Sequence, residues 1–463
     1  MIVREKKLIL PAGVETVLSA LSEGALFADL YFERSRDLRI VLEGEKIEQL
    51  STGEDAGVGL RRIEEDFHTN YAFSNDFSGE TLLALARRLG GRESARALEL
   101  NKPVASQLSV KVDPEEVRLS RKIEFVKQAA EVARRKSPEI RQVRVVYQES
   151  FKELVMLASE GRMVEESRLY TLFAVQVVAE RDGLLQQGYE PVGGTVGLEL
   201  FEEDPPEEVA RRAAERALLM LSARRAPGGR MPVVLSSSAG GTMIHEAVGH
   251  GLEADHAEEG FSVYAGRLGE KVASPLITVI DDPTLPGKRG SYLFDDEGVP
   301  AERVVLIENG VLKNFLYDRA TALKFGKKPN GHGRRESYRH RPIPRMANTY
   351  IAPGPHDPGE IIRSVSRGLL VKKMGGGEVN PVTGDFVFEV TEGYLIEDGE
   401  VGEPIRGATL VGNGPEVLRI IDMVGNDLGF GIGTCGKDGQ GVPVSDAQPT
   451  LRIPELIVGG EVR

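Results

Sequence analysis

Apolar positions in the first hundred residues follow two different periods. A helical period covers about 13–23, short alternating runs lie between 29 and 42, and Gly44 marks a hairpin turn after them. A second helical period near 79–90 is followed by another helical stretch. This order predicts an α+β unit over residues 1–105, with helices packed against an antiparallel sheet.

Residues 106–230 repeat this mixture of periods. Asp113-Pro114-Glu115-Glu116 and Asp204-Pro205-Pro206-Glu207 each resemble the start of a long helix, with Asp as N-cap, an early proline and a glutamate in the first turn. Strand-like runs between these two helices predict a second antiparallel layer. These runs are 142–149, 153–158 and 170–179. A helix-breaking segment at 224–229 is a plausible linker.

From residue 231 onward, short strand-like runs and dense glycine replace the long helical periods. Asn309-Gly310 and Asp398-Gly399 each lie between two such runs, which is the chemistry of a type I′ hairpin. The chain is therefore predicted to be α+β. Its N-terminal α/β sandwich layers contain antiparallel sheets, and a mostly β C-terminal domain, residues 231–463, follows them.

Length and charge narrow the functional classes. A chain of 463 residues exceeds one simple core, which favours two or three domains. The net charge of −13 opposes binding to a nucleic-acid backbone. No apolar run reaches the length of a membrane span, and the single cysteine fits a reducing compartment. We expect a cytoplasmic protein that binds neither nucleic acid nor membrane.

The strongest chemical signal is a pair of histidines with a glutamate beside one of them. His245, Glu246 and His250 lie within six residues, although the chain has only seven histidines. Two imidazoles and a neighbouring carboxylate can hold a divalent metal and activate a metal-bound water, as in zinc proteases with H-E-x-x-H. Residues five apart do not share a face of an ideal helix. We therefore expect a distorted metal-binding helix, widened by a π-bulge near Gly249 and Gly251.

The alternative is that both histidines are ordinary helix residues and that the glutamate is a solvated charge. A third ligand would favour the metal site, and Cys435 is the candidate, because a thiolate is a strong zinc ligand. The alternative for Cys435 is a buried structural thiol. Two acidic turns, 281–283 and 295–298, are interpreted as solvated, and His256 as an exposed helix-end residue rather than a partner of a metal ligand.

The chain resembles the TldD/PmbA metallopeptidase family, and in particular its TldD-type subunit, whose marker is H-E-x-x-x-H with a cysteine far downstream. The resemblance covers most of the chain and is strongest after residue 231. The segments that carry it are 245–253, 295–298, 333–338, 344–350 and 435–437.

This resemblance implies a zinc ion held by His245, His250 and Cys435, with Glu246 as the general base of peptide-bond hydrolysis. It also implies extended peptide substrates and a dimer, either a homodimer or a heterodimer with a related PmbA-type subunit. The expected substrates are unfolded segments and small flexible proteins.

Three polar residues downstream of the histidines are candidate substrate contacts: Arg345, Asn348 and Tyr350. The competing hypothesis for the whole chain is a non-catalytic, peptide-binding scaffold subunit of the same kind of dimer. The intact histidines, glutamate and cysteine favour the catalytic role.

Overall fold

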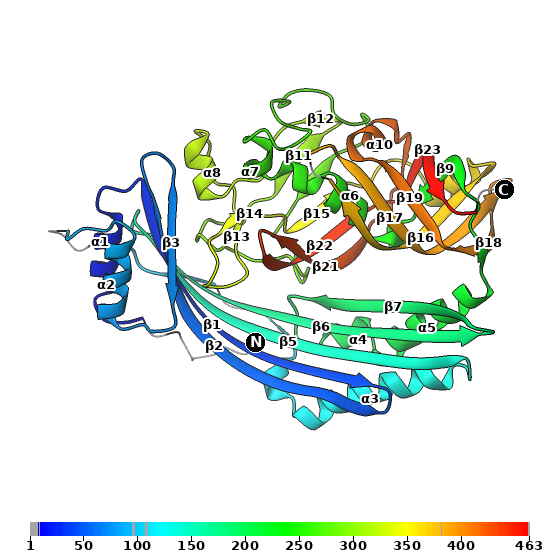
Figure 1. Cartoon of the computed structure of the whole chain (residues 1–463), viewed down its shortest axis with the longest axis horizontal. Coiled ribbons are helices and arrows are strands. Elements are labelled where there is room, and N and C mark those ends of the chain that lie inside the picture. The colour runs from blue at the N-terminus through cyan, green and yellow to red at the C-terminus, as the bar shows by residue number, and fades with distance from the viewer. Residues whose placement is uncertain (1–7, 9, 95–97, 107–109, 381, 462–463) are drawn as a thin grey trace.

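The computed structural model of the chain describes residues 8, 10–94, 98–106, 110–380 and 382–461. A long, twisted and mostly antiparallel sheet runs along one side of the molecule (Figure 1). Its strands, in sheet order, are β3 (Thr69–Ser74), β2 (Lys46–Ile63), β1 (Phe27–Glu43), β5 (Ile140–Ala158) and β6 (Met163–Arg181), with β4 (Val104–Ser106) and β7 (Leu184–Gly194) both paired to β6.

This sheet combines the first two predicted units. β1 pairs antiparallel with β5 from Asp29 to Glu43, so segments 1–105 and 106–230 contribute strands to one continuous sheet. α3 (Leu119–Arg135) and α5 (Pro206–Ser222) pack their alanine-rich sides on one end of it. α1 (Val14–Ser22) and α2 (Gly79–Arg88) cover the other end (Figure 1).

The remainder of the chain lies along the opposite side of the long sheet and contains two further large sheets and a two-stranded one (Figure 1). The larger has the order β16 (Arg367–Val379), β9 (Gly229–Leu235), β23 (Leu451–Gly459), β19 (Ala408–Asn413), β17 (Asp385–Glu397), β18 (Glu400–Arg406) and β8 (Arg224–Arg225), with β20 (Met423–Val424) on β23. The smaller has the order β12 (Val311–Leu312), β11 (Val304–Glu308), β10 (Val279–Asp281), β15 (Asn348–Ile351), β22 (Gln440–Gln448) and β21 (Gly429–Lys437).

Short elements complete this part of the chain. β13 (Gly333–Arg334) pairs with β14 (Ile343–Pro344), and the helices are α6 (Thr242–Ala247), α7 (Ala254–Ala257), α8 (Arg319–Lys324), α9 (Pro358–Arg363) and α10 (Gly414–Ile420). One hydrophobic cluster joins α6, through Met243 and Ile244, to both sheets. The predicted α+β class is confirmed. Among the described helices, none has the length and apolarity needed to cross a membrane.

Local predictions had mixed outcomes. Asn309 and Asp398 adopt φ of 48° and 50°, each followed by a glycine with positive φ, which confirms both type I′ hairpins. Asp113 accepts a hydrogen bond from the Glu115 amide, but it caps only a 3₁₀ turn, and α3 begins at Leu119. The predicted helical stretch after α2 is wrong for 91–94 and 98–103; residues 95–97 lie outside the described residues.

The interpretation of the acidic turn 295–298 as solvated is wrong. Asp295, Asp296 and Glu297 are at most 2% exposed, since the turn is inserted against arginines of the long sheet. Arg61 Nη1 lies 2.6 Å from Glu297, and Arg168 Nη1 lies 2.7 Å from Asp296. These buried ion pairs connect the long sheet to the C-terminal part of the chain.

The acidic turn at 281–283 is also largely buried. Asp281 is fully buried, and one of its oxygens lies 3.0 Å from His332 Nε2. The same carboxylate accepts hydrogen bonds from the Ala347 amide and the Thr349 hydroxyl. Its solvated interpretation is therefore wrong as well.

Candidate metal centre

α6 ends early, and its early end brings the two histidines together. The helix stops at Ala247, Val248 adopts φ −128° and ψ −50°, and a 3₁₀ turn, Gly249–Leu252, follows. The ring centroids of His245 and His250 are consequently 5.2 Å apart. The expected distortion is present, but it is a break between an α-helix and a 3₁₀ turn rather than a π-bulge.

Gly249 lies at a close contact in this break. A Cβ atom built there would lie 2.0 Å from Met346 Sδ, far inside van der Waals contact. The absence of a side chain lets the 3₁₀ turn approach Met346, which lies between β14 and β15.

Cys435 approaches the histidines from β21. Its Sγ atom lies 3.4 Å from His250 Nε2, and the donor atoms of His245, His250 and Cys435 all lie within 4.8 Å of one another. His245 and Cys435 are only 3% and 5% exposed. His245 Nδ1 is buried and has no hydrogen-bond partner among the described residues. Two imidazoles and a thiolate form a donor set that fits zinc, and they leave a fourth position free.

Electrostatics favour the ionised thiol. Burial raises the pKa of Cys435, but hydrogen bonds and charge from His245 and His250 outweigh burial and lower this pKa to about 5. Burial lowers the pKa of His250, yet Glu253 and Cys435 together raise it well above its usual value. The two imidazoles thus favour the thiolate form of Cys435.

Two carboxylates flank His250. Glu253 Oε2 lies 2.9 Å from Nδ1 of His250 and is fully buried, which leaves Nε2 of that ring for a ligand. Glu246 Oε2 lies 3.8 Å from Nε2, and its side chain is 39% exposed. Glu246 therefore lies beside the donor atoms but retains access to solvent.

The three candidate substrate contacts lie in different environments. Arg345 is fully buried and donates to the carbonyls of Cys435 and Gln440, at 2.6 and 3.3 Å. Asn348 is also buried, and it donates to the Asp282 carbonyl and the Ser291 hydroxyl. Tyr350 is half-buried, with its ring 6.3 Å from that of Phe430. Substrate contact stays a prediction for all three, and the geometry gives Arg345 and Asn348 internal roles.

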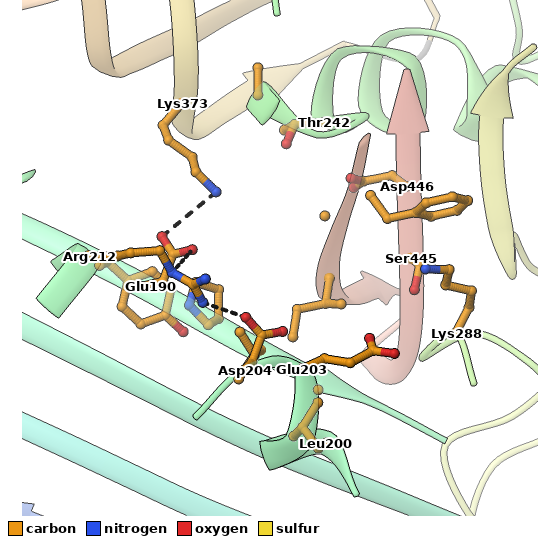
Figure 2. Close-up of a pocket in the computed structure, with 18 of the residues that line it drawn as sticks. Glu190, Leu200, Glu203, Asp204, Arg212, Thr242, Lys288, Lys373, Ser445 and Asp446 are labelled. Atoms are coloured by element: carbon orange, nitrogen blue, oxygen red, sulfur yellow. Dashed lines mark hydrogen bonds and ion pairs between the residues drawn. The ribbon is translucent and has the colours of Figure 1, made fainter. Parts of the chain in front are cut away.

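A cavity of about 1200 Å³ lies between the long sheet and the C-terminal part, and it reaches the start of α6 (Figure 2). Thr242 and Asp446 line one wall, and Asp446 Oδ1 accepts a hydrogen bond from the Gly241 amide at 2.8 Å. Burial raises the pKa of Asp446, although the nearby His245 lowers it. This wall lies one helical turn from a candidate ligand.

The opposite wall of the cavity is an ion-pair cluster. Glu190 lies 2.8 Å from Arg216 and 3.8 Å from Lys373, and Arg212 lies 2.6 Å from Asp204 of the same wall (Figure 2). These charges are largely paired with one another.

Sequence reasoning missed Glu253 and Asp446. Glu253 contacts Lys437, which is distant in the chain, and Asp446 accepts from the backbone amide of Gly241. Sequence reasoning also misjudged His256, which is half-buried with Nδ1 3.1 Å from the His250 carbonyl. The only available signal was that Glu253 and His256 follow His250 by three and six residues.

Three family models match consecutive segments: PmbA/TldA metallopeptidase domain 1 at 28–97, the central domain at 112–221 and the C-terminal domain at 228–460. A relative from Haemophilus influenzae named "Metalloprotease TldD homolog" is 38% identical over 94% of this chain and 93% of its own length.

Two other similar proteins add detail. A "Zinc metalloprotease TldD homolog" from Saccharolobus solfataricus is 37% identical over 48% of this chain and 50% of its own. The crystal structure of TldE from Thermococcus kodakarensis has the same fold, with a TM-score of 0.76 and 22% identity over 97% of this chain and all of that chain. The three matching domain models and the Haemophilus influenzae relative show that the chain belongs to the PmbA/TldD metallopeptidase family.

Proposed function

We propose that this protein is a zinc metallopeptidase that hydrolyses peptide bonds in extended peptides and small flexible proteins. The observation that carries the proposal is the convergence of His245, His250 and Cys435, with Glu246 Oε2 3.8 Å from His250 Nε2. The zinc-metalloprotease name of the Saccharolobus solfataricus relative supports the choice of metal.

In this proposal the bound zinc supplies Lewis acidity for the scissile carbonyl and for the attacking water. Glu246 accepts a proton from the attacking water and passes it to the leaving amine. Its position beside Nε2 of His250 and its partial exposure suit both steps. Glu253 holds the opposite edge of the His250 ring through Nδ1.

The cavity at the start of α6 is our proposed substrate cleft. β7 lines it, and among the described strands β7 pairs with β6 alone. An extended peptide can add to the free edge of such a strand through main-chain hydrogen bonds. This mode of binding favours unfolded segments and a modest sequence preference.

We also propose that the protein acts in the cytoplasm as a homodimer or as a heterodimer with a related subunit lacking the metal residues. The similarity to a protein named TldE supports a paired-subunit arrangement. Light scattering after gel filtration, with and without a co-expressed related subunit, distinguishes the two assemblies.

The decisive experiment measures zinc content and peptide cleavage together. Wild type should contain about one zinc per chain and cleave an unfolded peptide, and chelation should abolish cleavage. Glu246→Ala should keep zinc and lose cleavage, whereas Cys435→Ser should lose zinc. A zinc-loaded Glu246→Ala variant with near-normal cleavage would remove Glu246 from the chemistry.

A further inference from the structure

Lys437 lies on the same face of β21 as Cys435, two residues further along the strand. Side chains two apart on a strand share a face. Cys435 and Lys437 are both buried, whereas Thr434, which precedes Cys435, and Gly436, which lies between the two, are exposed. One strand therefore directs a thiol and an ammonium toward the segment 245–255, which contains both histidines, Glu253 and Asp255.

The Lys437 ammonium has three N–H donors, and three acceptors of neighbouring residues surround it. Nζ lies 3.0 Å from Glu253 Oε2, 2.7 Å from Asp255 Oδ1 and 3.2 Å from the Pro344 carbonyl. Its side chain is only 5% exposed, so this geometry is held inside the protein.

Glu253 connects Lys437 to His250. Its Oε2 atom contacts both Lys437 Nζ and His250 Nδ1, at 3.0 and 2.9 Å, and Oε1 accepts a 3.3 Å hydrogen bond from the Met346 amide. Glu253 is fully buried, and a buried carboxylate left without a cation is costly, so the contact with Lys437 compensates its charge.

A short segment, 344–346, forms hydrogen bonds with the same group of residues. Pro344 accepts from Lys437, Arg345 donates to the Cys435 carbonyl, and Met346 donates to Glu253. Three consecutive residues thus contact both the strand that contains the cysteine and the turn that contains His250.

We propose that Lys437 and Glu253 are positioning residues of the metal centre, which fix the Nδ1–H tautomer and the orientation of His250 relative to Cys435. The inference rests on the proposed zinc site. Carboxylates that orient a metal-bound histidine contribute about 10- to 100-fold to metal affinity. The ion pair also ties β21 to the helical turn at a second point, so the donors are held near one another before metal arrives.

The test is zinc affinity, measured by competition with a chromophoric chelator on Lys437→Met and Glu253→Gln. Each variant should bind zinc about 10- to 100-fold more weakly than wild type. The double variant should be little weaker than either single one, because both residues act through His250. The visible spectrum of the cobalt-loaded variants should change, which a purely structural role would not cause.

Lys122→Met is the matched control. Lys122, whose side chain is as buried as that of Lys437, forms an ion pair with Glu149, with a Nζ to Oε1 distance of 2.6 Å, between α3 and the long sheet. It should lower the melting temperature and leave zinc affinity unchanged. If Lys437→Met fails to fold, Glu253→Gln and Asp255→Asn replace it in the test. Asp255→Asn should weaken zinc binding less, because Lys437 still contacts Glu253 in that variant.

The outcomes separate this inference from the proposed function. Wild-type zinc affinity in the folded Glu253 and Lys437 variants, or independent and additive losses, would overturn the positioning role. A wild-type protein that binds zinc, shows the expected variant series and cleaves no peptide overturns the peptidase proposal alone. A wild-type protein that binds no zinc overturns both.

Discussion

Asp318→Asn should stabilise the protein at neutral and alkaline pH. Asp318 is the N-cap of α8, is 2% exposed and accepts hydrogen bonds from the amide and hydroxyl of Thr321. Burial and the nearby Glu297 raise its pKa from 3.8 to about 7. Asparagine keeps the capping oxygen without the charge.

The sign and size of this change in stability follow from proton linkage. Between about pH 4 and pH 7 the folded protein retains a proton on Asp318 that the unfolded chain has released. The free energy of unfolding therefore falls as pH rises across this interval, by up to about 4 kcal/mol at about 1.4 kcal/mol per pKa unit. The asparagine variant lacks this loss, so its advantage should be near zero at pH 4 and largest above pH 7.

Urea unfolding followed by circular dichroism at pH 4, 5.5, 7 and 8 measures the effect. Asp357→Asn is the control, because Asp357 caps α9 in the same way but is exposed, and it should change stability by less than about 0.5 kcal/mol at every pH. Parallel profiles for wild type and Asp318→Asn, or a variant that is less stable at pH 8, would refute the reasoning.

Two further substitutions test the connections that hold the long sheet in place. Arg61→Met leaves the buried carboxylates of Asp29 and Glu297 without their cation and should lower the free energy of unfolding, measured in urea, by about 3–5 kcal/mol. The exposed Arg230→Met should lower it by almost nothing. A loss below about 1 kcal/mol for Arg61→Met would mean that the network is not stabilising. Gly188→Ala places a Cβ 2.0 Å from the Ala213 carbonyl of α5 and should destabilise by about 1–3 kcal/mol, whereas Gly376→Ala meets open space and should not. Equal melting temperatures for the two alanine variants would contradict the close contact between β7 and α5.

The convergence of the candidate metal ligands was predictable in part, because His245, Glu246 and His250 are neighbours in the chain. The scarcity of histidine and cysteine made Cys435 the candidate third ligand, although it lies 185 residues beyond His250. The type of helix distortion was not predictable, because the sequence does not report that Met346 lies against Gly249. The hairpin turns were predictable for the same local reason, since Asn-Gly and Asp-Gly favour positive φ.

Long-range electrostatics were beyond sequence reasoning. Glu297 meets Arg61 across 236 residues of chain, and Glu253 meets Lys437 across 184. No periodicity in the sequence reports such a pairing, and an acidic turn in isolation is usually solvated. The single sheet shared by 1–105 and 106–230 escaped prediction for the same reason, as the pairing of β1 with β5 joins distant segments.

The alternation along β21 has a consequence for how this family can vary in length. Cys435 faces the histidines and Thr434 does not, so inserting or deleting a single residue between Gly429 and Thr434 would turn the thiol to the wrong face of the strand. The turn at Asp438-Gly439, where the hairpin reverses direction, lies after both Cys435 and Lys437. Length changes among relatives should therefore collect at this turn and be absent from the strand before it.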